Sequence, residues 1–140
     1  MRLPTRHPDW EPRLNACVEA WTPRDYTPAW GSDCVAFVLA AIEAVSAERL
    51  VFDGARPYRS AAGQGRWLKD MGWRSLLDAA DACLGDRIAP LQAHRGDVVS
   101  DGSVLGLMTA AGPVAFGEGG MVRMARGSIV AAWPVGRSDG

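Results

Sequence analysis

The residue best suited to covalent chemistry in this sequence is Cys34, which closes the segment WGSDC that begins at Trp30. The strongly apolar residues after it predict a central helix from Cys34 to Val45, with Ser32 or Asp33 as its N-cap. A helix N-terminus favours an anion, and the thiolate is the nucleophilic form of cysteine. Cys34 is therefore a candidate nucleophile for attack on a carbonyl carbon.

Such a nucleophile needs an imidazole beside the sulfur and a third group that orients the ring. The chain has two histidines, His7 and His94. The helix dipole contributes only about 0.3–1 kcal/mol, whereas losing a positioned acid–base group costs roughly 10²–10⁴ in rate. We therefore expect Cys34 to be an inactive nucleophile position that packs on the scaffold. His94 remains an alternative base if its loop folds back over the cleft, and His7 is expected to be a surface contact.

The hydrophobic pattern changes from a helical period to a strand period near Pro90. Helices are predicted over 10–21, 34–45, 66–71 and 75–84. Short strands are predicted over 97–100, 104–109, 113–116, 121–124 and 128–135. This order predicts an α+β domain, in which the N-terminal helices pack on a C-terminal antiparallel five-strand meander. We expect residues 1–8 to form an extended arm, 9–136 a single domain and 137–140 a flexible tail.

Composition narrows the function classes. The chain has 140 residues, 48% of them hydrophobic and 22% charged, which is typical of one globular domain. Its formal net charge of -1 argues against a nucleic-acid binder. The absence of a long apolar run or signal-like start predicts synthesis in a cytoplasm without membrane insertion. The three cysteines lack a C-x-x-C spacing, so we expect no disulfide framework, metal site or cofactor.

Asp97 and Asp101 could form a hydrolytic carboxylate pair, but a structural role at a strand entry is favoured.

The six tryptophans are expected to serve packing and recognition. Trp30 and Trp133 are predicted to lie in the core beside the Cys34 helix. Trp10 and Trp67, together with Arg13, are candidates for an interface, because Trp and Arg dominate many protein–protein contacts.

Four short motifs stand in order along residues 28–136: WGSDC at Trp30, RGDVV at Arg95, LGL at Leu105 and AWPV at Ala132. This order resembles the NlpC-type branch of the papain-like cysteine peptidases, which carry a D-C-x-x-[FL] helix start, a G-D-[LV]-[VI] strand and an H-[VA]-G-[IV] strand. The motifs are more similar to an uncharacterised subfamily encoded in the tail-gene clusters of siphophages, prophages and gene-transfer particles. The resemblance implies a papain-like NlpC-type fold.

The resemblance also implies where the missing catalytic groups would stand. The histidine strand falls on Val104–Leu107, so valine occupies the position of the base. The nearest candidates for the third polar group are Ala115, Phe116 and Gly117, none of which can orient an imidazole.

The implied function is a structural component of a phage or phage-like tail tip, built on a catalytically degenerate peptidase fold. Such a protein would reside in the virion tail after synthesis in the bacterial host cytoplasm, with tail-hub or distal-tail proteins as partners. The alternative is an active peptidoglycan endopeptidase of the tail that opens the cell wall with Cys34 and His94. A histidine donated by a partner chain, and a free adaptor or inhibitor that occludes a cleft, remain further possibilities.

Overall fold

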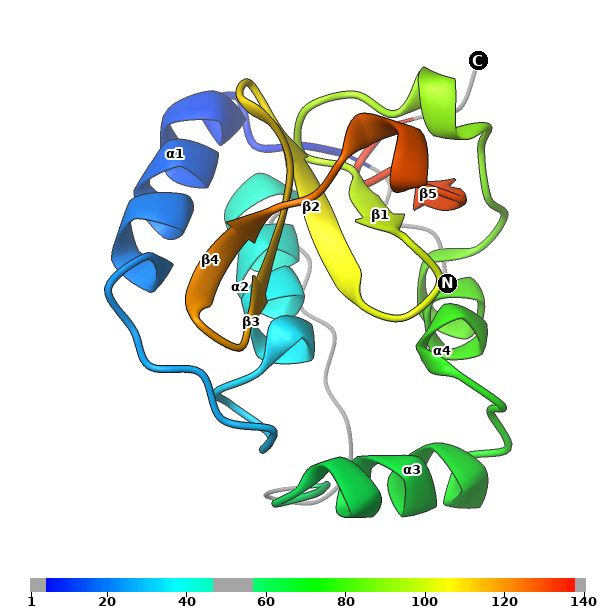
Figure 1. Ribbon diagram of the computed structural model, residues 1–140. Coiled ribbons are helices and arrows are strands. Elements are labelled where there is room, and N and C mark those ends of the chain that lie inside the picture. Colours follow the sequence, from blue (N-terminus) through cyan, green and yellow to red (C-terminus); the bar gives the residue numbers. More distant parts are fainter. Residues whose placement is uncertain (1–4, 47–56, 138–140) are drawn as a thin grey trace.

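The computed structural model describes residues 5–46 and 57–137, which form helices packed on one sheet (Figure 1). The predicted α+β class is confirmed. The helices are α1 (Trp10–Trp21), α2 (Cys34–Ser46), α3 (Ala61–Asp70) and α4 (Leu76–Leu84), with short 3₁₀ turns η1 (Pro90–Gln92) and η2 (Arg126–Ser128). The strands are β1 (Val98–Ser100), β2 (Leu105–Thr109), β3 (Gly112–Gly117), β4 (Gly120–Arg123) and β5 (Ala131–Trp133).

Most helix boundaries follow from local sequence, but α3 begins five residues earlier than the predicted start at Arg66. The Ser60 side chain caps this helix by accepting a hydrogen bond from the backbone N–H of Gly63 (3.0 Å). Gly63 and Gly65 weaken the helix propensity of the first turns and so conceal them from pattern analysis.

The strand order in the sheet is β4-β3-β2-β1-β5, with every neighbouring pair antiparallel. Strands β1 to β4 form the predicted meander, but the prediction is wrong for β5, which returns to pair with β1 and places Trp133 opposite Val98. The burial of the β5 side chains explains why this strand pairs with β1. All three β5 residues are buried and α4 packs against the strand, whereas β4 at the other edge is largely exposed.

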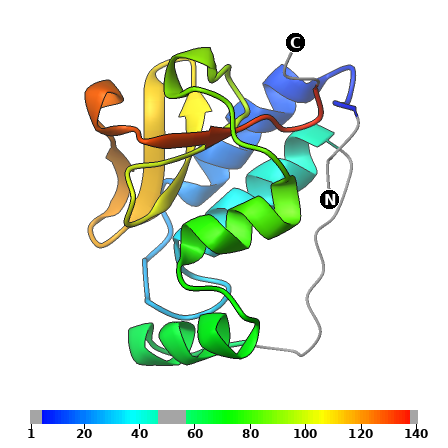
Figure 2. The ribbon, with the colours of Figure 1, turned by 90° about the vertical axis from the view of Figure 1, so that its right-hand side faces the viewer.

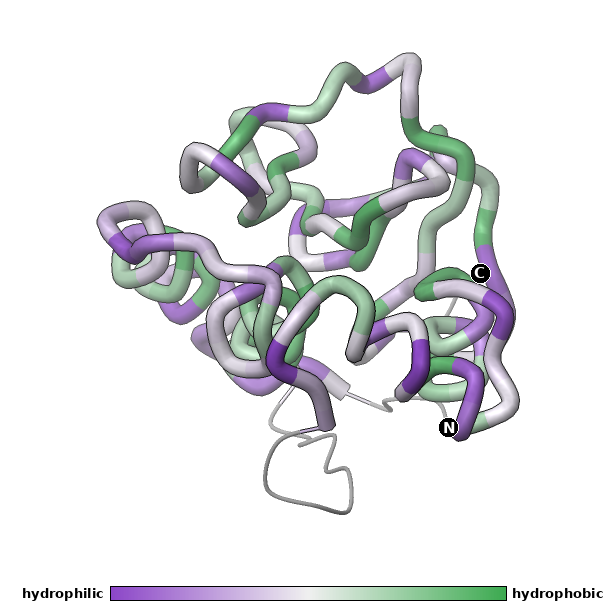
Figure 3. The backbone as a smooth tube through the Cα atoms, turned by 60° about the horizontal axis from the view of Figure 1, so that its bottom comes forward, coloured by the Kyte–Doolittle hydropathy of each residue, from purple (hydrophilic) through white to green (hydrophobic). Residues whose placement is uncertain are grey.

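Helix α2 is the centre of the core, as its apolar sequence predicted. It packs against β2, β3 and α1, and its fully buried side chains include Phe37 and Ile42. Figure 2 shows α1, α2 and α4 on the same side of the sheet. The helices show both hydrophobic and hydrophilic stretches in Figure 3, as expected where one face is buried.

Helix α3 lies apart from the other helices (Figure 1), and aromatic side chains join it to the neighbouring loops. The ring of Trp67 from α3 lies 5.7 Å from that of Trp30, 5.5 Å from that of Tyr58 and 5.6 Å from that of Trp73. Most of these pairs are edge-to-face, the arrangement that aromatic quadrupoles favour. This aromatic cluster positions α3 against the loop that precedes α2.

A buried carboxylate, that of Asp97, connects the two ends of the described chain. Asp97 has 0% of its surface exposed. Its Oδ1 accepts hydrogen bonds from Arg6 Nη2 (2.9 Å) and from the backbone N–H of Val135 (3.1 Å). Its Oδ2 accepts from Arg137 Nη2 and from the backbone N–H of His94. Residues 5–8 of the expected arm and the first residue of the expected tail are therefore docked on the domain, and 1–4 and 138–140 lie outside the described residues.

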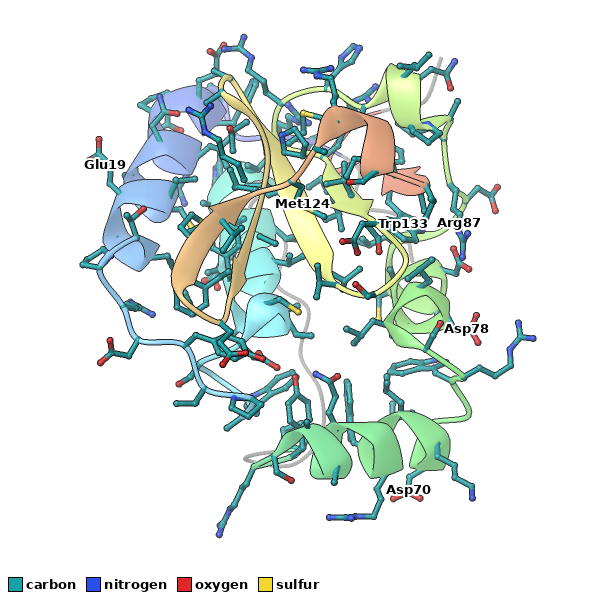
Figure 4. The ribbon with its side chains drawn as sticks, in the orientation of Figure 1. Glu19, Asp70, Asp78, Arg87, Met124 and Trp133 are labelled. Atoms are coloured by element: carbon teal, nitrogen blue, oxygen red, sulfur yellow. The ribbon has the colours of Figure 1, made fainter. Side chains whose placement is uncertain are left out.

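Replacing Asp97 with asparagine should lower the free energy of unfolding by about 3–5 kcal/mol, because it leaves two largely buried guanidinium groups without their counter-ion. Urea denaturation followed by circular dichroism measures this loss. The matched control is Asp70→Asn on the exposed end of α3, expected to change stability by less than about 0.5 kcal/mol (Figure 4). Equal midpoints for Asp97→Asn and wild type would contradict the assigned role.

Candidate functional site

Cys34 is the first residue of α2, where the motif predicted it, but its thiol is poorly placed for nucleophilic attack. The side chain of Asp33 caps the helix, and its Oδ1 accepts the backbone N–H of Ala36 at 3.0 Å. Only 7% of the Cys34 surface is exposed. Burial raises the pKa of the Cys34 thiol to about 11; the nearby Asp33 carboxylate also raises it, and a backbone hydrogen bond from Leu105 opposes the shift without cancelling it. The thiol is therefore protonated at neutral pH.

The carboxylate of Asp33 forms a buried polar network with the aromatic cluster. Only 2% of Asp33 is exposed, and burial raises the pKa of its carboxyl. The hydroxyl of Tyr58 donates a hydrogen bond to Asp33 Oδ2, and Gln64 Nε2 donates to the same oxygen at 3.4 Å. Burial, followed by this hydrogen bond and the Asp33 charge, raises the pKa of the Tyr58 hydroxyl. The sequence predicts Asp33 only as a helix cap, because no local pattern links it to Tyr58 and Gln64, which lie 25 and 31 residues away.

Neither histidine approaches Cys34. The Cys34 end of the molecule lies beside Leu105 at the start of β2. His94 lies near the other end of that strand, because Gly96 N donates to Met108 O at 2.8 Å, and Leu105 and Met108 are roughly 10 Å apart along a strand.

His7 is farther away. Its backbone N–H donates to the carbonyl of Val45 (2.8 Å), eleven residues beyond Cys34 in α2 and so roughly 16 Å along the helix axis.

The positions that the resemblance assigns to the base and the third polar group do come together. Val104, Ala115, Phe116 and Gly117 line one recess of about 350 Å³ at the start of β2. Their side chains carry no group that can accept a proton. Asp101 and Glu118 also line this recess, but Cys34 does not, so the four positions share a surface that excludes the thiol.

The residues proposed for an interface occupy different environments. Trp10 is half-buried, with the guanidinium carbons of Arg6 and Arg95 lying 4.3 and 5.8 Å from the centre of its ring. Arg13 is exposed, and its Nε donates to the carbonyl of Ala44 at 2.8 Å. Trp67 belongs to the aromatic cluster and therefore has a packing role.

The two tryptophans predicted for the core differ in how far they are buried. Trp133 is fully buried, as expected, and its Nε1 donates to Asp81 Oδ1 at 3.0 Å. Trp30 is half-buried beside the start of α2.

The motif glycines are explained by packing. In LGL, a Cβ on Gly106 would lie 2.4 Å from the carbonyl oxygen of Val114 and 2.7 Å from the sulfur of Met124. In RGDVV, Gly96 has φ +90° and supports the guanidinium of Arg6, which would lie 3.1 Å from a Cβ there. These motifs therefore preserve close backbone contacts.

Comparison with protein families found one match. The model of a domain family of unknown function, DUF6950, matches residues 5–135. The chain belongs to the DUF6950 family. No curated protein and no solved structure matches it. Within the described residues of this DUF6950 protein, no three His, Cys, Asp or Glu side chains gather to hold a metal ion, and no helix is long and apolar enough to cross a membrane.

The buried thiol predicts slow alkylation. In a Cys17→Ala/Cys83→Ala variant of this DUF6950 domain, iodoacetamide should modify Cys34 at pH 7.5 at least about 100-fold more slowly than a thiol with the usual pKa of 9.0, because the thiolate fraction falls by that factor. Mass spectrometry of timed samples measures the rate, and the same variant unfolded in urea is the control. A native rate that saturates below pH 7.5 would show an activated thiolate instead.

The polar network predicts a pH-dependent loss of stability in Tyr58→Phe. This change removes a donor that lowers the pKa of Asp33, so the raised folded-state pKa should rise further. A carboxyl with a raised folded-state pKa costs stability as the pH rises above its unfolded value. The loss, about 1–3 kcal/mol, should therefore be larger at pH 7 than at pH 4.

Thermal denaturation at the two pH values tests this pH dependence. Tyr26→Phe is the matched control, because the Tyr26 hydroxyl makes no hydrogen bond among the described residues. A loss that is equal at both pH values would contradict the assigned network.

Proposed function

We propose that this protein is a structural component of the tail tip of a phage or phage-like particle, built on an NlpC-like cysteine peptidase scaffold that no longer catalyses hydrolysis. The observation that carries the proposal is the state of Cys34. Its thiol is buried, its pKa is raised to about 11, and both histidines lie at the far ends of the elements that flank it. A cysteine peptidase needs the opposite arrangement, an accessible thiolate beside an imidazole.

Several features support descent from a peptidase scaffold. A cysteine begins the central helix and faces the start of the strand on which the NlpC pattern carries its histidine. The GDV motif opens β1, the strand next to it. Val104 and residues 115–117 share one recess, as a base and its orienting group would. The tail context rests on the order of the four sequence motifs.

The polar residues of the motifs support a structural role. Asp97 of RGDVV is saturated by arginines and backbone N–H groups, and Asp33 of WGSDC by Tyr58, Gln64 and the helix start. The indole of Trp133 in AWPV binds Asp81. Buried polar groups with such complete partners hold elements together rather than attack a substrate. From the tail context of the motifs, we propose tail-hub or distal-tail proteins as the partners.

The alternative, an endopeptidase that uses Cys34, is tested with purified peptidoglycan sacculi. We expect wild type and Cys34→Ala to release equal, background amounts of soluble peptide, measured by mass spectrometry of the supernatant. Thiol-dependent release that disappears in Cys34→Ala would overturn the structural assignment.

In the native particle, we expect deletion of the gene to prevent tail assembly and the Cys34→Ala gene to restore it. Electron microscopy and infectivity or transfer titres measure both outcomes. Normal assembly without the gene would also contradict a structural role.

A further inference from the structure

The groove at the opposite end of the molecule from Cys34 is lined by cations. Its charged lining residues are Arg6, Arg95 and Arg126, joined by His94 and the ring of Trp10, and it has a volume of about 410 Å³. No acidic residue is among the lining residues. Figure 1 shows why these segments meet, since the start of α1 and the turn between β2 and β3 lie at the same end of the molecule.

The three arginines differ in how far their charges are already satisfied. The guanidinium of Arg6 already has structural partners, because it donates hydrogen bonds to Asp97 and to the carbonyls of Val135 and Arg95. Arg95 forms an ion pair with Glu11 (3.0 Å), in which both side chains are about half exposed. Such an exposed pair contributes little and exchanges readily.

Arg126 is the cation with the least compensation. It is exposed, its Nη2 donates to the sulfur of Met108 at 4.0 Å, and it forms no ion pair among the described residues. The groove is also crowded with like charge. Burial lowers the pKa of Arg6, the Asp97 carboxylate opposes this shift, and repulsion from Arg137 and from Arg95 in the groove adds to it. An anion placed in the groove would relieve this repulsion.

We propose that this groove binds an acidic peptide segment of a partner protein, with its carboxylates paired to Arg126 and Arg95 beside the Trp10 ring. The inference deepens the proposed structural role and rests on it for the identity of the partner, but not for the groove's affinity for carboxylates. A net charge of -1 for the whole chain makes this cation-lined groove a local exception, which would steer an acidic segment to this end. Exposed arginine beside tryptophan is also the composition of many protein-binding hot spots.

The favoured occupant is a peptide rather than a nucleic acid. Nucleic-acid binding by phosphate neutralisation uses a row of cations along an extended face, whereas here two of the three groove arginines already have acidic partners. Carboxylates spaced along a short peptide match Arg126 and, by exchange with Glu11, Arg95, because arginine pairs with carboxylate in a planar, bidentate geometry.

The test uses the full-length chain and a fluorescein-labelled hexaglutamate peptide. Fluorescence anisotropy at about 50 mM salt should show binding that weakens as salt is raised. Arg126→Gln should weaken it about five- to tenfold, the loss expected for one charge-assisted pair. Arg66→Gln on α3 removes the same charge outside the groove and should leave the affinity unchanged. The indole NMR signal of Trp10, assigned with Trp10→Phe, should shift on titration with the peptide.

Three outcomes would overturn the proposal. They are no binding of hexaglutamate, equal weakening by Arg126→Gln and Arg66→Gln, or tighter binding of a single-stranded oligonucleotide of equal charge than of the peptide. The two proposals can fail separately. If hexaglutamate binds but deletion of the gene leaves particle assembly normal, the groove proposal stands and the tail role is contradicted.

Discussion

The buried carboxylate of Asp97 is the constraint on which the rest of the structure depends. A charge with no exposed surface is stable only when opposite charge and hydrogen-bond donors surround it. Arg6, Arg137 and two backbone N–H groups meet this requirement from three distant parts of the chain. The RGDVV and AWPV motifs meet here, since Asp97 binds the N–H of Val135. This single site therefore joins both ends of the described chain to the first strand.

A second buried carboxylate organises the other end of the molecule. Asp33 caps α2 and connects that helix, through Tyr58 and Gln64, to α3 and its aromatic cluster. The same burial that makes this network stable suppresses the chemistry of Cys34 beside it. Desolvation disfavours the thiolate more strongly than the helix start and the Leu105 N–H favour it. The burial that stabilises the start of α2 therefore makes the Cys34 thiol less reactive.

The two ends of the molecule thus differ in what they can do. At the Cys34 end, every buried side-chain polar atom of the described residues has a hydrogen-bond partner, and the recess around Val104 contains no histidine. At the other end, Trp10 and three arginines surround an open groove, and the charge of Arg126 has no acidic partner among the described residues. A protein that recognises rather than cleaves uses its surface in this way, because recognition needs exposed charge and catalysis needs positioned acid–base groups.

The sequence by itself determined the α+β class, α1, the start of α2 at Cys34, the end of α4 at Gly85 and the β1–β4 meander, because these follow from periodicity, capping residues and turn glycines a few residues apart. Only the tertiary structure decided the pairing of β5 with β1, the Asp33–Tyr58 bond, the docking of Arg6 and Arg137 on Asp97, and the separation of both histidines from Cys34. These contacts join residues 25 to 91 positions apart, and local patterns carry no information about partners that meet only after the chain has folded.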